Sequence, residues 1–278
     1  MSHTCHSILR DSKGRLVSEV ASVSADLKDG HFIGDHSHPE DQLLFASTGV
    51  MTVHTKEGIW VVPPLRAVWI PANTKHSVAI SGSVSMRTLY LLPKLFGFAP
   101  MKCLVMDVSP LLRELILHAC KFGRLRRRSA LERRVIEIVI DQLKAVERVP
   151  LQLPYPHDAR AMRIVNTLSS DPGDHRKLEE LCQAACAGKR TIQRVFLRET
   201  GMTFGRWRQQ LRLLHGLQRL AHGDKVSSAA MEAGYNSASA FIAVFRKQLA
   251  ATPTRYVQAE RLKERRSPHE LSSVTSHK

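Results

Sequence analysis

The chain has 278 residues, a length that fits two domains of ordinary size, each able to bury its own core. Lys and Arg outnumber Asp and Glu by 41 to 25, which gives a formal net charge of +16. Most of the excess lies in residues 157–266, with 20 basic against 10 acidic side chains, while residues 1–100 carry 9 against 8. Such a basic region favours a polyanionic partner and argues against an all-helical domain whose charges are merely solvated.

Cysteine spacing and segment hydropathy argue against a disulfide-bonded secreted protein and against a membrane-spanning protein. Five cysteines without paired spacing fit a reducing compartment better than a disulfide framework. The N-terminus lacks a charged-then-apolar signal pattern, and no run of about eighteen apolar residues occurs. We therefore expect a soluble cytoplasmic protein with no membrane partner.

Residues 15–95 are predicted to be rich in β-strands. Short apolar runs are separated by Gly, Pro, Asn and Ser at intervals of about eight to twelve residues, which is typical of a sandwich or small barrel. The predicted strands span residues 50–54, 59–62, 67–70, 77–80 and 85–92. The large apolar side chains at strand spacing are predicted core residues, namely Leu44, Phe45, Trp60 and Trp69. Glu40 and Asp41 are expected in a solvated loop.

Two short motifs in this β-rich region resemble the signature motifs of the cupin superfamily. The first runs from His36 through His38 to Gln42, and the second runs Pro-Ala-Asn-Thr-Lys-His and ends at His76. Gln42 stands where the superfamily usually has Glu, and Asn73 stands where it usually has Gly. The resemblance implies that residues 1–100 form a cupin β-barrel, an RmlC-like jelly roll that serves as a sensor domain.

The histidines of these motifs form a candidate metal or ligand site. His36 and His38 alternate along a strand, so both imidazoles point to one face, and His76 from a neighbouring strand could complete the set with the Gln42 carbonyl as a fourth, neutral donor. Such a site could hold a divalent transition metal, with lower affinity than one that contains a carboxylate. The alternative is that the histidines only form hydrogen bonds in the barrel mouth. No catalytic residue is assigned.

Residues 101–150 are predicted to form a helical linker region. Ser109 and Pro110 open a helix that runs to about residue 121. A second helix, over residues 129–146, places six apolar side chains on one side: Leu131, Val135, Ile138, Val139, Leu143 and Val146. Ile136 and Ile140 extend the apolar surface beyond what one contact needs, so this helix packs either on the barrel or against a second copy in a homodimer. Three prolines in residues 150–156 mark a domain boundary.

The remaining sequence contains two helix-turn-helix patterns. In the first, which ends near Phe196, Ile192 and Val195 fall on one face of an amphipathic helix while Arg190 and Arg194 fall on the other. The pattern repeats with Phe241, Val244 and Phe245, after a Gly-Tyr-Asn corner that begins at Gly234. A helix of about five turns, from Phe204 to Ala221, joins the two patterns.

These motifs resemble the DNA-binding domain of the AraC/XylS family of transcription regulators. The resemblance covers residues 157–258 and rests on the Gly201-Met-Thr-Phe segment, the Gly234-Tyr235-Asn corner with its following Phe residues, and the terminal Thr252-Pro-x-x-Tyr. Cys182 and Cys186 replace the Ala and Gly that are usual in the first turn, and because both are small we expect the packing to survive. Residues 267–278 are predicted to be a disordered tail. The expected fold class is thus multidomain α+β, with an N-terminal cupin barrel, a helical linker region and a C-terminal all-α domain.

The resemblance also implies which side chains contact DNA. Arg and Gln pair bidentately with guanine and adenine edges, so the first motif is expected to read most of the sequence, and the second can offer only methyl or hydroxyl contacts. The predicted base-contacting residues are Arg190, Gln193, Arg194, Ala238, Ser239, Ile242 and Ala243. The predicted phosphate-contacting residues are Arg198, Arg206, Arg246 and Lys247, from a wider pool that also contains Arg208, Arg212 and Arg255.

Together these expectations describe a one-component transcription regulator. The implied partners are double-stranded DNA, a small-molecule effector bound by the barrel, and RNA polymerase if the protein activates transcription. Within the family, a barrel with the His-x-His and Gln pattern resembles those of regulators of neighbouring exporter genes, which favours a repressor. Binding to chromosomal DNA would associate the protein with the nucleoid.

Two other interpretations remain. A metal-dependent cupin enzyme with a DNA-binding appendage would need a filled metal site and acid or base groups, and Gln42 in place of Glu counts against it. An architectural or RNA-binding protein would need aromatic side chains in basic surroundings, which are scarce in this sequence. The regulator is preferred, and no enzyme activity is expected.

Overall fold

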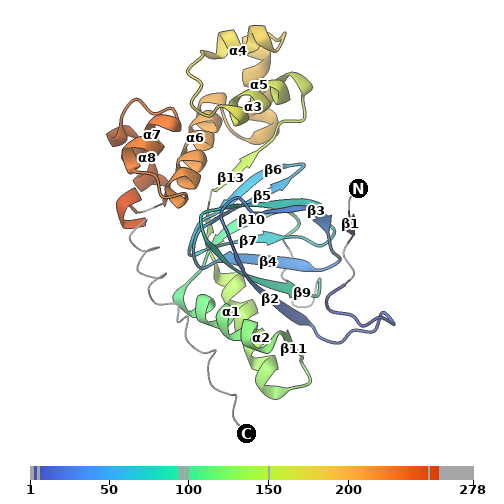
Figure 1. The fold of residues 1–278 in the computed structure, drawn as a ribbon. Helices are drawn as coiled ribbons and strands as arrows, with labels where there is room; N and C mark the ends of the chain where they lie inside the picture. The colour runs from blue at the N-terminus through green and yellow to red at the C-terminus, as the bar shows by residue number, and fades with distance from the viewer. Residues whose placement is uncertain are drawn as a thin grey trace.

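The computed structural model describes residues 3–4, 7–93, 97, 100–149, 151–249 and 251–256. Its N-terminal part is built from two β-sheets (Figure 1). The six-stranded sheet contains, in spatial order, β1 (His3–Thr4), β3 (Phe32–Ser37), β8 (His76–Ser81), β5 (Val50–Thr55), β6 (Gly58–Val62) and β13 (Gln152–Pro154). The seven-stranded sheet contains β11 (Arg124–Leu125), β2 (Val20–Leu27), β9 (Val84–Leu91), β4 (Asp41–Ala46), β7 (Arg66–Ile70), β10 (Leu104–Asp107) and β12 (Arg148–Val149). The predicted β-rich domain is confirmed, and among the described residues it is a sandwich of two sheets and not one closed barrel.

Alternation along the strands divides the buried side chains between two cores. On β4, Leu44 belongs to the cluster between the sheets, while Leu43 and Phe45 belong to a cluster on the outer side of the seven-stranded sheet. The outer cluster is completed by Trp69 and by two helices that cover this sheet, α1 (Pro110–Phe122) and α2 (Ala130–Ala145). The predicted core residues Leu44, Phe45, Trp60 and Trp69 are all buried.

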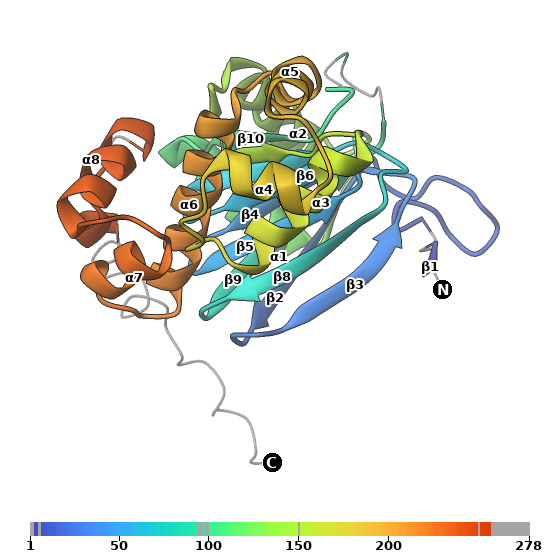
Figure 2. The ribbon, with the colours of Figure 1, turned by 90° about the horizontal axis from the view of Figure 1, so that it is seen from above.

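The C-terminal part is helical and lies on the other side of the sandwich (Figures 1 and 2). It contains α3 (Ala159–Ser170), α4 (Leu178–Ala184), α5 (Lys189–Thr200), α6 (Phe204–Ala221), α7 (Val226–Glu232) and α8 (Ala238–Leu249). The chain is therefore layered, with α1 and α2, then the seven-stranded sheet, the six-stranded sheet, and finally the C-terminal helices. Each predicted helix is present. Two of them start at the expected N-cap: Ser109 accepts from Leu112 N–H at 3.1 Å, and Thr203 accepts from Arg206 N–H at 3.3 Å.

The structure differs from the sequence expectations in the region between the two parts. Four strands, β10 to β13, lie beyond residue 100, and β13 falls in the proline-rich segment that was expected to be a boundary, where it pairs with β6. An exposed sheet edge is a row of unpaired backbone groups, so a short extended segment that follows the sandwich in sequence readily completes it. Residues 101–154 thus contribute to the sandwich as well as linking it to the C-terminal helices.

Two further details of the sequence analysis are wrong. Glu40 and Asp41 are buried, because Glu40 accepts a hydrogen bond from Ser7 and Asp41 begins β4 and accepts the N–H of Ala72 at 2.9 Å. On α2 the buried face contains Ile136 and Ile140, while Ile138 is 44% exposed. Ile136 and Ile140 thus pack on the sheet, which is one of the two alternatives that the sequence left open.

No helix in the described parts of the chain combines the length and the apolar character needed to span a bilayer. The predicted disordered tail, residues 267–278, and the last residues of the predicted DNA-binding domain lie outside the described residues.

Candidate functional site

The first helix-turn-helix motif is formed by α4 and α5. The short helix α4 ends in a tight turn in which Cys186 adopts a left-handed conformation with φ of 52°, and Ala187 N–H donates to the carbonyl of Cys182 at 2.9 Å. The buried face of α5 packs through Phe196, whose ring lies 5.3 Å from that of Phe204 and 5.4 Å from that of Trp207. This packing fixes α5 against α6, as expected for a recognition helix that docks by one apolar face.

The opposite face of α5 is open to solvent. Arg190, Gln193 and Arg194 are all exposed, whereas Ile192 is 0% and Val195 3% exposed. The structure therefore brings the three predicted base-contacting residues of the first motif together on one free helix face. Their side chains can approach the edge of a base pair without disturbing the core.

The second motif, α7 and α8, repeats the arrangement. Gly234 has a φ of 78° at the turn, and Phe241 and Phe245 are fully buried with their rings 5.5 Å apart. Of the predicted base-contacting residues on α8, Ser239 and Ala243 are exposed and Ala238 and Ile242 are half-buried. The predicted base-contacting positions of α8 thus offer smaller side chains than those of α5, and none of them is charged.

The predicted phosphate-contacting residues lie at the surface. Arg206, Arg246 and Lys247 are exposed. The Arg198 side chain is 68% exposed and forms an ion pair with Glu199 at 2.7 Å. Glu199 in turn accepts the N–H groups of His157 and Asp158 at 2.8 and 3.1 Å, so it anchors the start of α3 to α5.

Two members of the wider arginine pool bind backbone carbonyls within the protein. Arg208 has a side chain that is 14% exposed and donates to the carbonyl of Arg176 at 2.6 Å. Arg212 donates to the carbonyl of Asp174 at 2.7 Å. Burial lowers the pKa of both guanidinium groups, which stay charged at neutral pH. Arg208 and Arg212 are therefore engaged within the domain, in contrast to the exposed Arg206, Arg246 and Lys247.

The sandwich brings the three predicted histidines together. His36 on β3 pairs in register with His76 on β8, and the ring centroids lie 4.2 Å apart. His38 follows β3, with its ring centroid 5.3 Å from that of His76. One ligand atom from each of the three imidazoles lies within 4.8 Å of the others, a spacing that a single metal ion can bridge.

Backbone carbonyls orient each of these rings. The Nδ1 atoms of His36, His38 and His76 lie 2.8, 2.9 and 2.9 Å from the carbonyls of Gly34, Glu40 and Thr74. A ring that donates from Nδ1 leaves Nε2 as a bare acceptor, which is the arrangement seen in histidines that bind metals. Nε2 of His76 is buried and has no hydrogen-bond partner within the described residues.

Gln42 completes the group, as predicted. Its Oε1 lies 3.1 Å from Nε2 of His38, and its Nε2 donates to the Tyr90 hydroxyl at 3.4 Å. Burial lowers the pKa of His38, and lowers that of His76 to about 4, so both imidazoles are neutral at pH 7, the form that binds a metal.

A hollow of about 570 Å³ lies against the strands that carry the histidines, but none of the three histidines lines it. Asp35 and Ser77, the chain neighbours of His36 and His76, lie in its wall, together with His54, Lys75 and Cys103. Its volume is within the range of small-molecule sites. This hollow could not be predicted from the sequence, because its walls come from strands and turns with no shared motif.

The six-stranded sheet also contacts the C-terminal helices directly. Gln218 of α6 donates to the hydroxyl of Thr52 on β5 at 2.8 Å, and His222 lies 3.1 Å from the carboxylate of Asp29. Trp207 donates from Nε1 to the carbonyl of Pro154 at 2.9 Å. These contacts were not predicted, since Thr52 and Gln218 are 166 residues apart.

Comparisons with known proteins agree with this architecture. Residues 21–147 match the family model of an AraC-like ligand binding domain, and residues 181–259 match that of a helix-turn-helix domain. The HTH-type transcriptional regulator NimR of Escherichia coli (strain K12) is 33% identical over 222 residues, which cover 80% of this chain and 81% of that protein. The HTH-type transcriptional regulator RipA of Corynebacterium glutamicum is 35% identical over 115 residues, 41% of this chain and 34% of that protein.

Among solved structures, unsaturated fatty acid bound ToxT from Vibrio cholerae aligns over 87% of this chain and 95% of its own, with 14% identity and a TM-score of 0.37. The two matched domains and the similarity to NimR along most of both sequences lead to one conclusion. The chain belongs to the AraC/XylS family of transcription regulators, with an AraC-like ligand-binding domain followed by a DNA-binding domain that contains two helix-turn-helix motifs.

Proposed function

We propose that this regulator reads its DNA site chiefly through α5. The observation that carries the proposal is the division of α5 into a fully buried apolar face and an exposed face with Arg190, Gln193 and Arg194. These are the side chains that distinguish guanine and adenine in the major groove. The helix α8, with Ser239 and Ala243 exposed, adds weaker contacts such as a methyl contact to thymine.

The test is a comparison of α5 variants on duplexes selected in vitro by the full-length protein. Arg190→Ala and Arg194→Ala should each cost on the order of 1–3 kcal/mol of specific binding and relax the preference at particular base pairs. Arg206→Ala is the matched control on α6: as the loss of a phosphate contact, it should weaken binding to all duplexes alike and reduce the salt dependence by about one charge. Unchanged affinity and footprint in both α5 variants would remove α5 from the reading surface.

We further propose that the sandwich holds a divalent transition metal between His36, His38, His76 and Gln42. The residues fit such an ion because one ring nitrogen from each of the three histidines lies within 4.8 Å of the others, each ring is oriented through Nδ1, and the buried Nε2 of His76 lacks a partner among the described residues. Three imidazoles and an amide oxygen suit Zn²⁺, Co²⁺ or Ni²⁺. In a transcription regulator the ion would act as a signal or as part of the effector site.

Titration of the chelator-treated protein with Co²⁺, followed by visible absorbance and calorimetry, tests this site. His76→Ala should abolish binding and Gln42→Glu should tighten it, since a carboxylate is the stronger ligand, while His118→Ala on the exposed face of α1 should change nothing. Equal titration curves for His76→Ala and the wild type would refute the site.

The finer features of regulation are part of the same proposal. A small-molecule effector would bind in or beside the sandwich. Three further expectations stay predictions: repression of an exporter gene, a contact with RNA polymerase, and an intracellular place of action at the nucleoid. Homodimerisation also stays a prediction, and the exposed Leu131 and Ile138 of α2 are the apolar surface that supports it. Selection of genomic fragments by the purified protein, with and without divalent metal, would identify the operator.

A further inference from the structure

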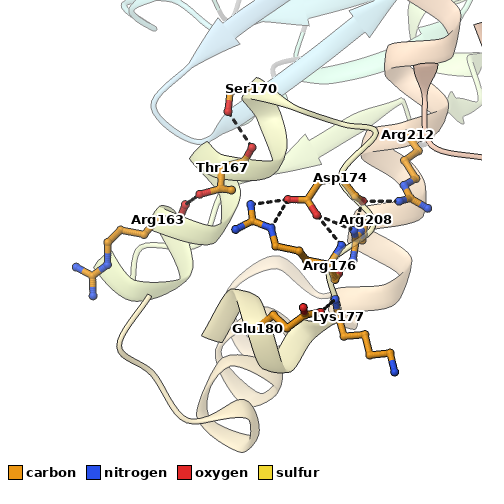
Figure 3. Close-up of polar contacts among 9 residues, drawn as sticks. All are labelled: Arg163, Thr167, Ser170, Asp174, Arg176, Lys177, Glu180, Arg208 and Arg212. Atoms are coloured by element: carbon orange, nitrogen blue, oxygen red, sulfur yellow. Dashed lines mark hydrogen bonds and ion pairs between the residues drawn. The ribbon is translucent and has the colours of Figure 1, made fainter. Parts of the chain in front are cut away.

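The loop between α3 and α4, residues 171–177, is folded around a buried carboxylate. Asp174 is only 8% exposed. Its carboxylate accepts the backbone N–H of Arg176 at 2.7 Å and the Nε and Nη2 groups of the same residue at 2.8 and 2.6 Å. Figure 3 shows Asp174 between Arg176 on one side and Arg208 and Arg212 on the other. The loop that leads into the first motif therefore has one defined shape.

Two arginines of α6 hold this loop from outside. Arg208 and Arg212 are four residues apart, so both project from the same side of the helix. Arg208 donates to the carbonyl of Arg176 at 2.6 Å and also to that of Asp174, and its Nη2 lies 3.7 Å from the Asp174 carboxylate. Arg212 donates to the carbonyl of Asp174 at 2.7 Å and to that of Pro172 at 3.3 Å. Two planar guanidinium groups thus satisfy three carbonyls of one loop, a geometry that the single ammonium group of lysine cannot reproduce.

Arg212 also contacts the second motif. A Cβ atom on Gly234, the turn residue between α7 and α8, would lie 2.9 Å from the Nε, Cζ and Nη2 atoms of Arg212. The loop before α4 also approaches α7 directly, because a Cβ atom on Gly173 would lie 3.0 Å from the carbonyl oxygen of Glu232, the last residue of α7. The loop before α4, the side of α6 and the turn before α8 therefore meet at one place, which we call the Asp174 clamp: Pro172, Asp174, Arg176, Arg208 and Arg212.

We infer that the Asp174 clamp sets the distance and angle between α5 and α8, so that Asp174 and Arg212 determine which spacing of base contacts the protein accepts. The clamp residues are positioning residues, because they act on DNA only through the two recognition helices. The inference rests on the proposed function, in which both helices contact DNA. Each added base pair moves a contact block by about 3.4 Å along the duplex and by about a tenth of a turn around it, so a rigid pair of helices must be selective for spacing.

The experiment measures binding of the full-length protein to duplexes of different spacing. A duplex selected in vitro by the wild type is mapped by footprinting, and variants of it are made with the two contact blocks one base pair closer and one or two base pairs further apart. Dissociation constants are measured by fluorescence anisotropy for the wild type, Arg212→Ala and Asp174→Ala. The variants Arg212→Lys and Asp174→Asn, which keep a cation and an Asx-type turn, provide milder changes in case the alanine variants do not fold.

We expect the wild type to lose tenfold or more in affinity at each altered spacing. Compared with the wild type on the same duplex, the clamp variants should bind about tenfold more weakly at the selected spacing but less than about twofold more weakly at the altered ones. Their affinity should therefore depend less on spacing than that of the wild type. Gln209→Ala, at an exposed position of the same helix, should keep the wild-type profile, and Arg206→Ala should lower affinity by one factor at every spacing.

Two outcomes would overturn the inference, and they are distinguishable. If folded clamp variants lose the same factor at every spacing, the clamp stabilises the domain without setting the spacing, and the proposed function stands. If the wild type itself is indifferent to spacing, simultaneous reading by both helices is wrong, and the inference fails together with that part of the proposed function.

Discussion

At the scale of single residues, the two helix-turn-helix turns can be compared directly. Cys186 and Gly234 hold equivalent places, two residues after the ends of α4 and α7, and both have positive φ, 52° and 78°. In each turn the following N–H closes on a carbonyl five residues back, from Ala187 to Cys182 at 2.9 Å and from Tyr235 to Ala230 at 3.0 Å. Only the second turn has the glycine that this conformation favours, so the first carries backbone strain.

Cys186→Gly should therefore stabilise the protein. Glycine removes the steric cost of a Cβ in the left-handed conformation, which should raise the free energy of unfolding by about 1 kcal/mol. Part of this gain is offset because glycine increases the conformational entropy of the unfolded chain. Urea denaturation measures the change. Cys186→Ser is the control, since it removes the thiol and keeps the Cβ, and it should bring no gain. A destabilised Cys186→Gly variant would contradict this account of the turn.

The stability of the metal-free protein should fall as the pH falls below about 6.5. Burial lowers the pKa of His76 from 6.5 to about 4. Between those values the unfolded chain binds a proton that the folded chain does not, so acid favours unfolding, while above pH 6.5 this group has no effect. The expected slope is on the order of 1 kcal/mol per pH unit. Urea midpoints at pH 7.5 and 5 in the presence of a chelator measure it, and His76→Gln should have a shallower slope than the wild type.

At the scale of elements, α6 is the axis of the DNA-binding domain. Phe196 of α5 packs on Trp207, near the start of α6, and Phe241 of α8 packs on Gly216, near its end. A Cβ on Gly216 would lie 2.6 Å from the Phe241 ring, so α8 approaches α6 more closely than any larger residue would allow. The same helix bears Arg208 and Arg212 of the Asp174 clamp. One rigid helix thus fixes the positions of both recognition helices.

Gly216→Ala tests this close approach. In an isolated helix the change would be favourable by about 0.5–1 kcal/mol, since glycine is a poor helix former. Here the added methyl group displaces the Phe241 ring, and we expect a net destabilisation of roughly 1–3 kcal/mol, measured by thermal or urea unfolding. Gly205→Ala, where nothing lies within 4 Å of the new Cβ, is the matched control in the same helix and should not destabilise. Equal effects of the two substitutions would show that α8 does not depend on the contact.

At the scale of the whole molecule, the six-stranded sheet carries the histidine group and also contacts the DNA-binding domain. Within the six-stranded sheet, β5 and β8 are hydrogen-bonded neighbours. His76 of β8 belongs to the histidine group, and Thr52 of β5 accepts from Gln218 of α6. Gly82, just after β8, has a φ of 76°, and a Cβ there would lie 2.4 Å from the carbonyl oxygen of Ala221 at the end of α6. A movement of β5 and β8 would therefore displace α6, the helix that positions α5 and α8.

Gln218→Ala should loosen this contact between the domains. Loss of the hydrogen bond to the buried Thr52 hydroxyl is worth about 1 kcal/mol. We expect faster amide hydrogen exchange in β5 and in the last turns of α6, with an affinity for selected DNA within about threefold of the wild type. Arg219→Ala, which removes ion pairs with Asp224 and Glu232 inside the C-terminal domain, should speed exchange in α7 and leave β5 unchanged. Unaltered exchange in Gln218→Ala would show that the contact does not couple the domains.

The sequence by itself determined the local elements and the chemistry of the exposed recognition face. Strands at residues 50–92 and the helix from Phe204 to Ala221 follow from apolar periodicity and turn residues, which act over a few neighbours. The three histidines and Gln42 were predicted together, because two short motifs resemble a known signature, although Gln42 lies on β4 of the seven-stranded sheet while His36 and His76 lie on neighbouring strands of the other sheet. The roles of Arg208 and Asp174 were missed, since an arginine in a basic domain gives no local sign that it is buried.

Only the tertiary structure decided which face of α2 meets the sheet, that residues 152–154 complete the sandwich, and that Thr52 meets Gln218. Each of these depends on packing between segments far apart in the chain, where several apolar or polar faces compete and the choice is made by the shape of the partner surface. Local sequence specifies a helix and its faces, but which of two apolar faces is buried is decided by what the rest of the chain places beside it.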